Sequence, residues 1–260
     1  MRLTVERLSI ALARLPEAFE GVTVALAGDL HARAGPGGSA AAAAMVSALN
    51  ALEPDLIILL GDLVHHPVTA SACLALPSGL TAKHGVWACL GNHEHAFVWY
   101  SRWLGEGRQP SLDQWRRIYA AAGIRLLANE ARPIQRDGGR LWLLGIDDPY
   151  SGHDDLAAAL SEAPTQECLI AFTHSPDLAD HRMIAEVDLL LAAHTHGGQI
   201  RVPGLGALYA PCRNPRRRAA GLLSGERTTV YVSRGVGEAF PLRLCCPREI
   251  TLITLRRPGR

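Results

Sequence analysis

Six short apolar runs recur along the sequence, and each ends at a glycine or at a polar residue. Their ranges are 22–28, 55–61, 85–91, 141–145, 167–173 and 187–193. Continuous apolar runs of this length are typical of strands that are buried on both faces. Helical patterns lie between the runs, at 39–52, 111–123, 154–163 and 176–186. Strands that alternate with helices predict an α/β fold with a largely covered sheet.

Two of these helices carry recognisable end signals. Ser39 and Ser111 are suitable N-cap residues, and Pro54 and Gly123 are suitable stops. After residue 200 the pattern changes, because strand-like runs follow one another with few helical candidates between them. These runs lie at 207–211, 228–235, 242–246 and 249–255. We expect them to form a second, antiparallel or mixed portion that completes a sandwich, within a single domain over residues 1–260, since no linker-like stretch divides the chain.

Composition excludes several classes of protein. A net charge of +1 argues against a dedicated nucleic-acid binder, so we expect no nucleic-acid partner. No apolar run approaches the roughly 18–20 residues of a membrane span. The first 21 residues carry Glu6, Arg7 and Arg14 in place of an apolar signal-peptide region, which predicts a cytoplasmic protein. The six cysteines form no C-x-x-C pair, which favours reduced and mostly buried thiols.

Metal-ligating residue types follow five of the six apolar runs. They are Asp29 and His31, then Asp62, then Asn92 and His93, then His174, and finally His194 and His196. Ligands in open α/β sheets bind beyond the carboxyl ends of the strands, so these side chains are expected to converge. Imidazole and carboxylate suit Mn, Fe or Zn, and the set is too large for one ion. The sequence therefore predicts two divalent metal ions at one site.

Spacing suggests how neighbouring ligands share that site. Residues at i and i+2 of an extended segment point the same way, so Asp29 and His31 would face one side, as would His194 and His196. Gly197 and Gly198 would let the chain turn sharply and leave room for substrate near the ions.

These motifs resemble the calcineurin-like metallophosphoesterase superfamily. The matching segments are AGDLH (27–31), LGD (60–62), LGNHE (90–94), THS (173–175) and AHTHGGQ (193–199), with weaker matches at VSRGVG (232–237) and PREI (247–250). HTHGGQ and SRGVG look most like the bacterial branch of UDP-2,3-diacylglucosamine pyrophosphatase-like phosphodiesterases, some of which are membrane-anchored. The implied fold is a four-layer α/β/β/α sandwich, with two mixed sheets and flanking helices.

The resemblance also implies residue roles. Asp29, His31 and His196 would hold the first ion, Asn92, His174 and His194 the second, and Asp62 would bridge both. A hydroxide bridging the two ions would attack phosphorus. Asn92 would help to neutralise the phosphoryl oxygens, and His93 would protonate the leaving oxygen without binding metal.

The implied activity is hydrolysis of a phosphoester or pyrophosphate. The substrate would be a phosphorylated small molecule or a lipid-linked nucleotide such as UDP-2,3-diacylglucosamine, which would bring peripheral contact with a membrane. A nuclease or cyclic-nucleotide phosphodiesterase would use the same centre. A non-catalytic scaffold is the alternative, but it would be expected to lose ligands that are all present here. The sequence leaves the metals, the substrate and the oligomeric state open.

Two positions depart from the family pattern. Ala193 stands where a glycine is usual, which is tolerable if its φ is negative and strained if φ is positive. Gly28 stands where a serine is common, and we expect this change to be harmless.

Several further features allow two interpretations. The arginines between Arg213 and Arg218 could grip a diphosphate or form a solvated loop, and the loop is favoured. The Trp99–Trp103 segment could cap the cleft or pack as a helix. Asp147 and Asp148 could form a rim loop, although a turn is favoured. Glu94 is expected to orient a histidine rather than to bind metal. His65 or His66 could line the site, although a surface position is favoured for both.

Overall fold

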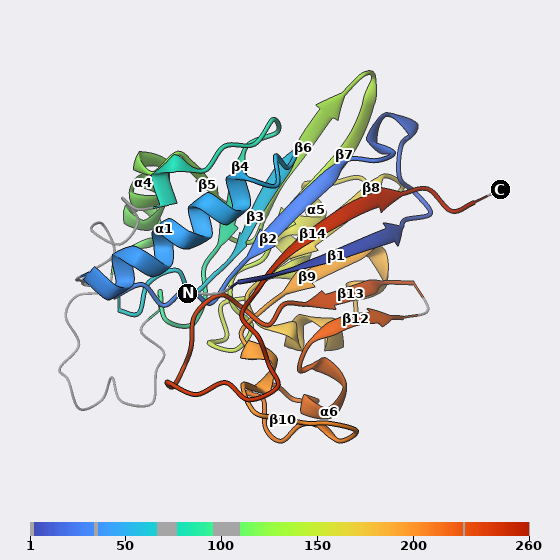
Figure 1. The fold of residues 1–260 in the computed structure, drawn as a ribbon. Helices are drawn as coiled ribbons and strands as arrows, with labels where there is room; N and C mark the ends of the chain where they lie inside the picture. The colour runs from blue at the N-terminus through green and yellow to red at the C-terminus, as the bar shows by residue number, and fades with distance from the viewer. Residues whose placement is uncertain (1–2, 34–35, 67–76, 96–109, 226, 260) are drawn as a thin grey trace.

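Two six-stranded sheets lie face to face and form the centre of the molecule (Figure 1). The computed structural model describes residues 3–33, 36–66, 77–95, 110–225 and 227–259. Both sheets are mixed, and helices cover the outer face of each. The arrangement is the α/β/β/α sandwich that the motifs predicted.

The first sheet joins the two ends of the chain to four internal strands. Its strands follow the order β1 (Thr4–Ala11), β14 (Glu249–Arg256), β2 (Thr23–Ala27), β3 (Leu56–Leu60), β4 (Val86–Cys89) and β5 (Ile124–Leu126). β14 pairs parallel to β1 and antiparallel to β2, whereas β2 to β5 run parallel to one another.

The second sheet is built from the middle of the chain. Its order is β12 (Gly221–Ser224), β13 (Thr229–Val232), β9 (Leu189–Ala192), β8 (Cys168–Phe172), β7 (Gly139–Gly145) and β6 (Glu130–Arg136). The four central strands run parallel, and each edge strand is antiparallel to its neighbour. A separate two-stranded hairpin, β10 (Arg201–Val202) and β11 (Gly206–Ala207), follows β9.

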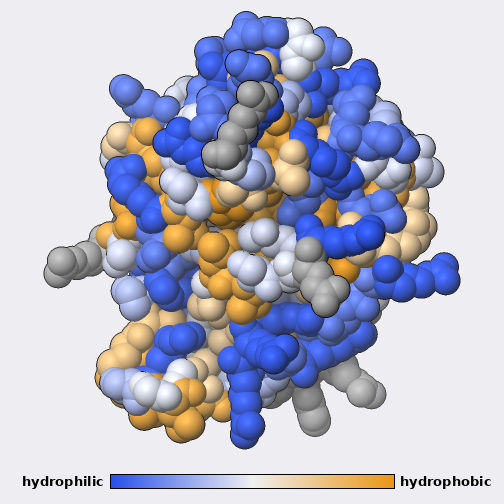
Figure 2. Space-filling view, turned by 90° about the vertical axis from the view of Figure 1, so that its right-hand side faces the viewer, coloured by the Kyte–Doolittle hydropathy of each residue, from blue (hydrophilic) through white to orange (hydrophobic). Residues whose placement is uncertain are grey.

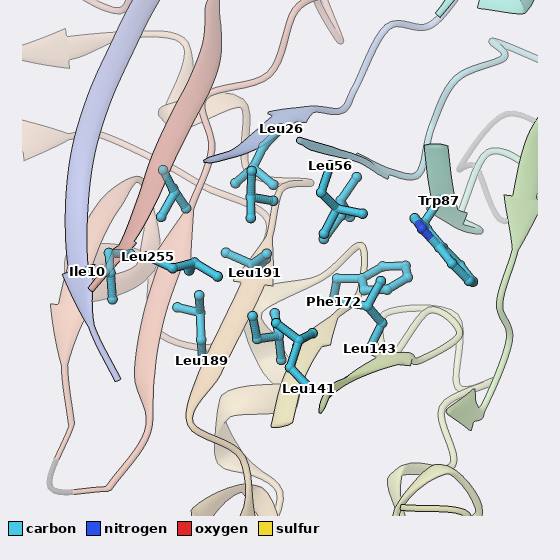
Figure 3. Packing of buried hydrophobic residues seen from close by; sticks show 14 of the residues in the cluster. Ile10, Leu26, Leu56, Trp87, Leu141, Leu143, Phe172, Leu189, Leu191 and Leu255 are labelled. Atoms are coloured by element: carbon cyan, nitrogen blue, oxygen red, sulfur yellow. The ribbon is translucent and has the colours of Figure 1, made fainter. Parts of the chain in front are cut away.

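The core fills the space between the sheets. Leu26, Leu56 and Trp87 of the first sheet point toward Leu191 and Phe172 of the second (Figure 3). Such burial of apolar side chains supplies most of the driving force for folding. The runs are apolar throughout because strands of this kind meet the other sheet on one face and helices on the other.

Helices complete the outer layers. The α-helices are α1 (Pro36–Asn50), α4 (Leu112–Ala121), α5 (Leu156–Ser161) and α6 (Pro215–Arg218). Shorter 3₁₀ segments are η1 (Glu17–Phe19), η3 (Pro77–Gly79), η4 (Pro176–Asp180), η5 (Ile184–Glu186) and η6 (His196–Gly198). α1 and α4 pack on the outside of the first sheet, through Met45, Leu49, Trp115 and Tyr119. α5 packs on the outside of the second sheet.

All six apolar runs form strands, and the capping prediction at Ser111 is confirmed. Ser111 accepts from the backbone N–H of Gln114, whose side chain accepts in return from the Ser111 N–H. α1 begins at Pro36 instead of Ser39, since proline suits the first helical position.

Other element predictions are wrong. Residues 176–186 form η4 and η5 separated by a bend instead of one helix. The tail makes no separate portion, because β13 enters the second sheet and β14 enters the first. Of residues 207–211 only Ala207 lies in a strand, and 242–246 contributes a single bridge between Leu244 and Ile200.

The two sheets approach closely where β2 and β9 end. A Cβ atom at Gly28 would lie 3.0 Å from the Cβ atoms of both Ala193 and Leu60. Ala193 is fully buried and its φ is negative, so its extra methyl group is not strained. The two departures from the family pattern therefore compensate, since the methyl group of Ala193 occupies space that a side chain at position 28 would need.

We expect Gly28→Ala to lower the free energy of unfolding by about 1–3 kcal/mol, because it overpacks this contact. The double variant Gly28→Ala/Ala193→Gly should recover at least about 0.5 kcal/mol of that loss. Urea unfolding of the two single variants and the double variant measures both quantities. Strictly additive effects would show that the two positions do not share this space.

Candidate metal centre

The predicted ligands lie on tight turns immediately after the buried strands. Asp29, His31, Asp62, His194 and His196 all have positive φ, between 47° and 68°. This left-handed conformation is uncommon for residues other than glycine, although Asp, Asn and His adopt it more readily than most. The extended i and i+2 geometry expected for these pairs is therefore wrong. The turns bring the side chains together, and His194 and His196 join different ligand groups.

The first ligand group contains Asp29, His31 and His196, whose donor atoms all lie within 4.8 Å of one another. The Nε2 atoms of His31 and His196 are 3.0 Å apart, and Nε2 of His196 is 3.8 Å from Asp29 Oδ1. All three residues are buried. This is the group predicted for the first ion.

The second group contains Asp62, His174 and His194. His174 Nε2 lies 3.2 Å from Asp62 Oδ2 and 3.0 Å from His194 Nδ1. Asp62 Oδ2 is also 3.7 Å from Nε2 of His31, so this carboxylate reaches both groups. Its other oxygen, Oδ1, accepts from the backbone N–H of His93.

Donor spacing and bonding in both groups fit bound cations. Two ligands about 2.1 Å from one ion lie about 3.0–3.4 Å apart, which matches the two nitrogen pairs. His174 donates its Nδ1–H to the Leu60 carbonyl, so its Nε2 is the free ligand atom. Among the described residues, the buried carboxylate atom Asp29 Oδ2 has no hydrogen-bond partner. Buried polar atoms without partners are costly in a protein interior, and a ligand would relieve the cost.

The charge state of the histidines also suits metal ligation. Burial lowers the pKa of His31, His194 and His196, which favours the neutral form that binds metal. Burial acts against a charge on His174 as well, but the Asp62 carboxylate outweighs it and raises the pKa of His174 well above its usual value. A cation bound here would have to displace that proton.

Asn92 and His93 follow Gly91 at the end of β4 and line the same pocket. The Nδ1–H of His93 donates to the carbonyl of His65, 2.9 Å away. Nε2 of His93 then faces the ligands, 4.0 Å from Asp62 Oδ2. A Cβ atom at Gly91 would lie 2.3 Å from Asp62 Oδ1, so only glycine permits this approach of the two turns.

Glu94 has a different role from the one expected. Its buried carboxylate accepts from the backbone N–H groups of Asp62, Leu63 and Gly91, at 2.8–2.9 Å. Among the described residues it makes no hydrogen bond to a ligand histidine. It therefore joins the turn after β3 to the turn after β4. Nothing in the sequence around Glu94, two residues after Asn92, indicates that it joins these two turns.

Gly197 and Gly198 do make the sharp turn that was expected, with φ of 66° and 79°. Gly198 also lines the cavity over the ligands, but the Cβ directions of both glycines point into protein. A Cβ atom at Gly197 would meet Cys246 Sγ at 2.6 Å, and one at Gly198 would meet Ala207 Cβ at 2.5 Å. The glycines therefore allow close packing of the chain as well as the sharp turn.

A cavity of 310 Å³ opens over the ligand groups. Its walls contain most of the predicted site residues, while Asp29 and His174 lie fully buried beneath. Residues that were not predicted as part of the site also line it, among them His65, Tyr150, Tyr209 and Phe240. The surface position expected for His65 is wrong, since its ring lies 5.3 Å from that of His93. Tyr150 packs on the ring of His194, with 4.4 Å between centroids.

The arginine segment and Asp148 take the structural roles that were favoured over a role in the site. The arginines between Arg213 and Arg218 do not line the cavity, and Arg218 pairs with Asp180. Asp148 caps a turn by accepting from the backbone N–H groups of Tyr150 and Ser151. The Trp99–Trp103 segment lies outside the described residues. Five of the cysteines are described, and all five are free thiols.

None of the described helices combines the length and the apolar character needed to cross a membrane.

Comparison with known proteins identifies the class. A family described as calcineurin-like phosphoesterase matches residues 22–198, which include every predicted ligand and His93. The chain is 34% identical over 205 residues to Phosphodiesterase YaeI of Escherichia coli (strain K12), covering 78% of this chain and 71% of the relative. It is 30% identical over 217 residues to the uncharacterized metallophosphoesterase YkuE of Bacillus subtilis (strain 168), covering 82% and 71%.

Solved structures agree on the fold. The chain resembles the Haemophilus influenzae NAD nucleotidase NadN with a TM-score of 0.53 and 15% identity, over 83% of this chain. It resembles a 5'-nucleotidase precursor of Thermus thermophilus with a TM-score of 0.50 and 15% identity, over 90% of this chain. The aligned parts are about half of each nucleotidase, 50% and 54%.

The chain belongs to the calcineurin-like phosphoesterase family. It is a hydrolase that acts on phosphoester bonds, and members of this family depend on metal ions.

We expect Glu94→Gln to lower the free energy of unfolding by about 2–4 kcal/mol, because an amide cannot accept from three backbone N–H groups as a carboxylate does. Affinity for Mn²⁺ should fall as well, since two ligand-bearing turns would loosen. Urea unfolding and a metal titration measure the two effects. Wild-type values for both would remove Glu94 from this role.

Metal binding should release protons. A ligand must lose its proton before it binds a cation, and Asp62 raises the pKa of His174. The affinity for Mn²⁺ should therefore fall as the pH drops from about 8 to about 6. Calorimetry in two buffers of different ionisation enthalpy tests this. Identical enthalpies in both buffers, with a flat affinity, would contradict it.

Proposed function

We propose that this chain is a phosphodiesterase with a dinuclear centre that binds Mn, Fe or Zn. Asp29, His31 and His196 would hold one ion, Asn92, His174 and His194 the other, and Asp62 would serve both. The observation that carries the proposal is the position of Asp62 Oδ2, within 3.2 Å of His174 and 3.7 Å of His31, between two groups of buried ligands.

When bound, two such cations supply a hydroxide nucleophile near neutral pH and neutralise the charge on phosphoryl oxygens. The protein's own groups would do the rest. His93 would deliver a proton from Nε2 to the leaving oxygen, because the carbonyl of His65 holds the Nδ1–H on the opposite side of the ring. Asn92 would donate its amide N–H to a phosphoryl oxygen and so favour the transition state.

A diester is favoured over other phosphoesters for two reasons. The relative from Escherichia coli is named a phosphodiesterase. The aromatic residues Tyr150, Tyr209 and Phe240 line the cavity beside the ligands, and they would accommodate a second, apolar ester group. UDP-2,3-diacylglucosamine belongs in the test set as a lipid-linked candidate, although the arginines from Arg213 to Arg218 would not grip its diphosphate in the cavity.

Removal of metal followed by separate addition of Mn, Fe, Zn and Mg tests the proposal. The wild type should regain hydrolysis of bis(p-nitrophenyl) phosphate with at least one transition metal. Asp62→Asn should lose that activity by at least about a hundredfold, because a shared anionic ligand is gone. Asp113→Asn, an exposed carboxylate on α4, is the matched control and should behave as the wild type. Inactivity of the wild type with every metal and substrate would overturn the proposal.

A second variant separates acid catalysis from positioning. His93→Ala should lower kcat by about 10²–10⁴-fold on a diester with an alkyl leaving group, which needs a proton. The loss should be far smaller with p-nitrophenolate, which leaves without one. Equal losses on both substrates would mean that His93 positions the substrate and donates no proton.

A further inference from the structure

An exposed apolar surface adjoins one side of the cavity. We call it the apolar lobe and define it as Leu205, Leu208, Tyr209, Phe240, Leu242 and Leu244, whose side chains are 45–73% exposed. Figure 2 shows hydrophobic residues gathered on a lobe at the lower end of the molecule, the level at which Figure 1 places β10 and α6. Contiguous exposed apolar surface on a globular protein usually marks an interaction site.

The apolar lobe is a built feature of the fold. It combines the β10–β11 hairpin with a second segment, residues 239–246, that lies some way further along the chain. The side-chain amide of Gln199 joins them, donating to the carbonyls of Phe240 and Leu242 and accepting from the N–H of Ala239. The backbone N–H of Arg201 also donates to the Leu244 carbonyl. These bonds tie the two segments of the lobe to each other.

The lobe is continuous with the cavity. Tyr209 and Phe240 belong to both, and Gln199 lines the cavity together with His194 and His196. Whatever covers the apolar lobe therefore lies at the mouth of the metal centre.

Positive charge borders this apolar surface. From Leu189 to Gly225 the sequence contains five arginines and no Asp or Glu. Three of them lie on α6, which packs against β11 and β12. Arg216 and Arg217 of that helix are exposed, whereas Arg218 pairs with Asp180. The rest of the chain balances these charges, so the net charge of +1 conceals a cationic region.

We propose that the apolar lobe docks on an anionic lipid surface, with the α6 arginines against the headgroups. Leucine and aromatic side chains beside arginines are the pattern by which proteins bind the membrane interface. A second copy of this chain fits less well, because self-association would bring the two arginine-rich helices together. Given the phosphodiesterase proposed above, on which this step rests, the natural substrates would be phosphodiesters carried on lipids, presented headgroup first to the cavity.

Vesicle sedimentation tests the docking without metal or substrate. The wild type should sediment with phosphatidylcholine vesicles containing phosphatidylglycerol and less with phosphatidylcholine alone. Leu205→Asp/Leu208→Asp and Arg216→Glu/Arg217→Glu should each lower the partition coefficient at least about tenfold. Leu112→Asp and Arg117→Glu, exposed on α4, are the matched controls and should bind as the wild type. Thermal unfolding should be similar for all variants.

Three outcomes would overturn the proposal. The wild type could fail to bind anionic vesicles, the lobe variants could bind as well as the wild type, or Leu205→Asp/Leu208→Asp could abolish a dimer seen in solution, which would assign the lobe to a second copy. Hydrolysis of soluble bis(p-nitrophenyl) phosphate should be unchanged in the lobe variants. Absence of that activity in the wild type would refute the phosphodiesterase and leave the vesicle result standing.

Discussion

The metal centre depends on turns from two separate sheets being held in fixed relation. Glu94 accepts from the N–H groups of Asp62 and Gly91, which joins the turns after β3 and β4. The N–H of Asp29 donates to the Gly61 carbonyl, which joins the turns after β2 and β3, and that of His194 donates to Asp29 Oδ1, which joins the turns after β2 and β9. These bonds run through backbone groups that cannot be left unpaired when buried. The ligand atoms therefore converge because the backbone hydrogen bonds around them leave no other arrangement.

The same constraint explains the close packing around the site. Left-handed φ angles at residues other than glycine cost free energy, and they persist only where the surrounding structure enforces them. Close contacts that only glycine permits likewise depend on the surrounding packing. Between Gly28 and Ala193 there is room for one methyl group, which is that of Ala193. The position of each ligand is thus determined mainly by the packing of the whole sandwich, and only slightly by the conformational preference of the ligand residue itself.

Much of this could be predicted from the sequence. The strands were readable because burial on both faces leaves continuous apolar runs, and the ligands were readable because each follows such a run. The insertion of β14 between β1 and β2 was not, because strand order is a long-range property that residues 249–255 do not encode locally. The left-handed turns and the role of Glu94 were missed for a similar reason, since they arise from backbone contacts between turns far apart in sequence. The contribution of Tyr209 and Phe240 to the cavity wall could not be predicted either, because it depends on how the hairpin and residues 239–246 fold together.

The apolar lobe lies at the mouth of the cavity, where it can affect which substrates reach the ligand groups. A dinuclear centre can attack many phosphodiesters, so selectivity has to come from what reaches the cavity mouth. Here the aromatic rings of Tyr209 and Phe240 line the cavity and are also part of the exposed apolar lobe. Under the docking proposed above, substrates that combine an anionic phosphate with an apolar body would be favoured.

Anomalous diffraction from crystals soaked in Mn²⁺ tests the central claim most directly. We predict two peaks about 3.5–4 Å apart, one beside Asp29, His31 and His196 and one beside His174 and His194, with Asp62 between them. A single peak, or manganese bound elsewhere with these side chains vacant, would contradict the account.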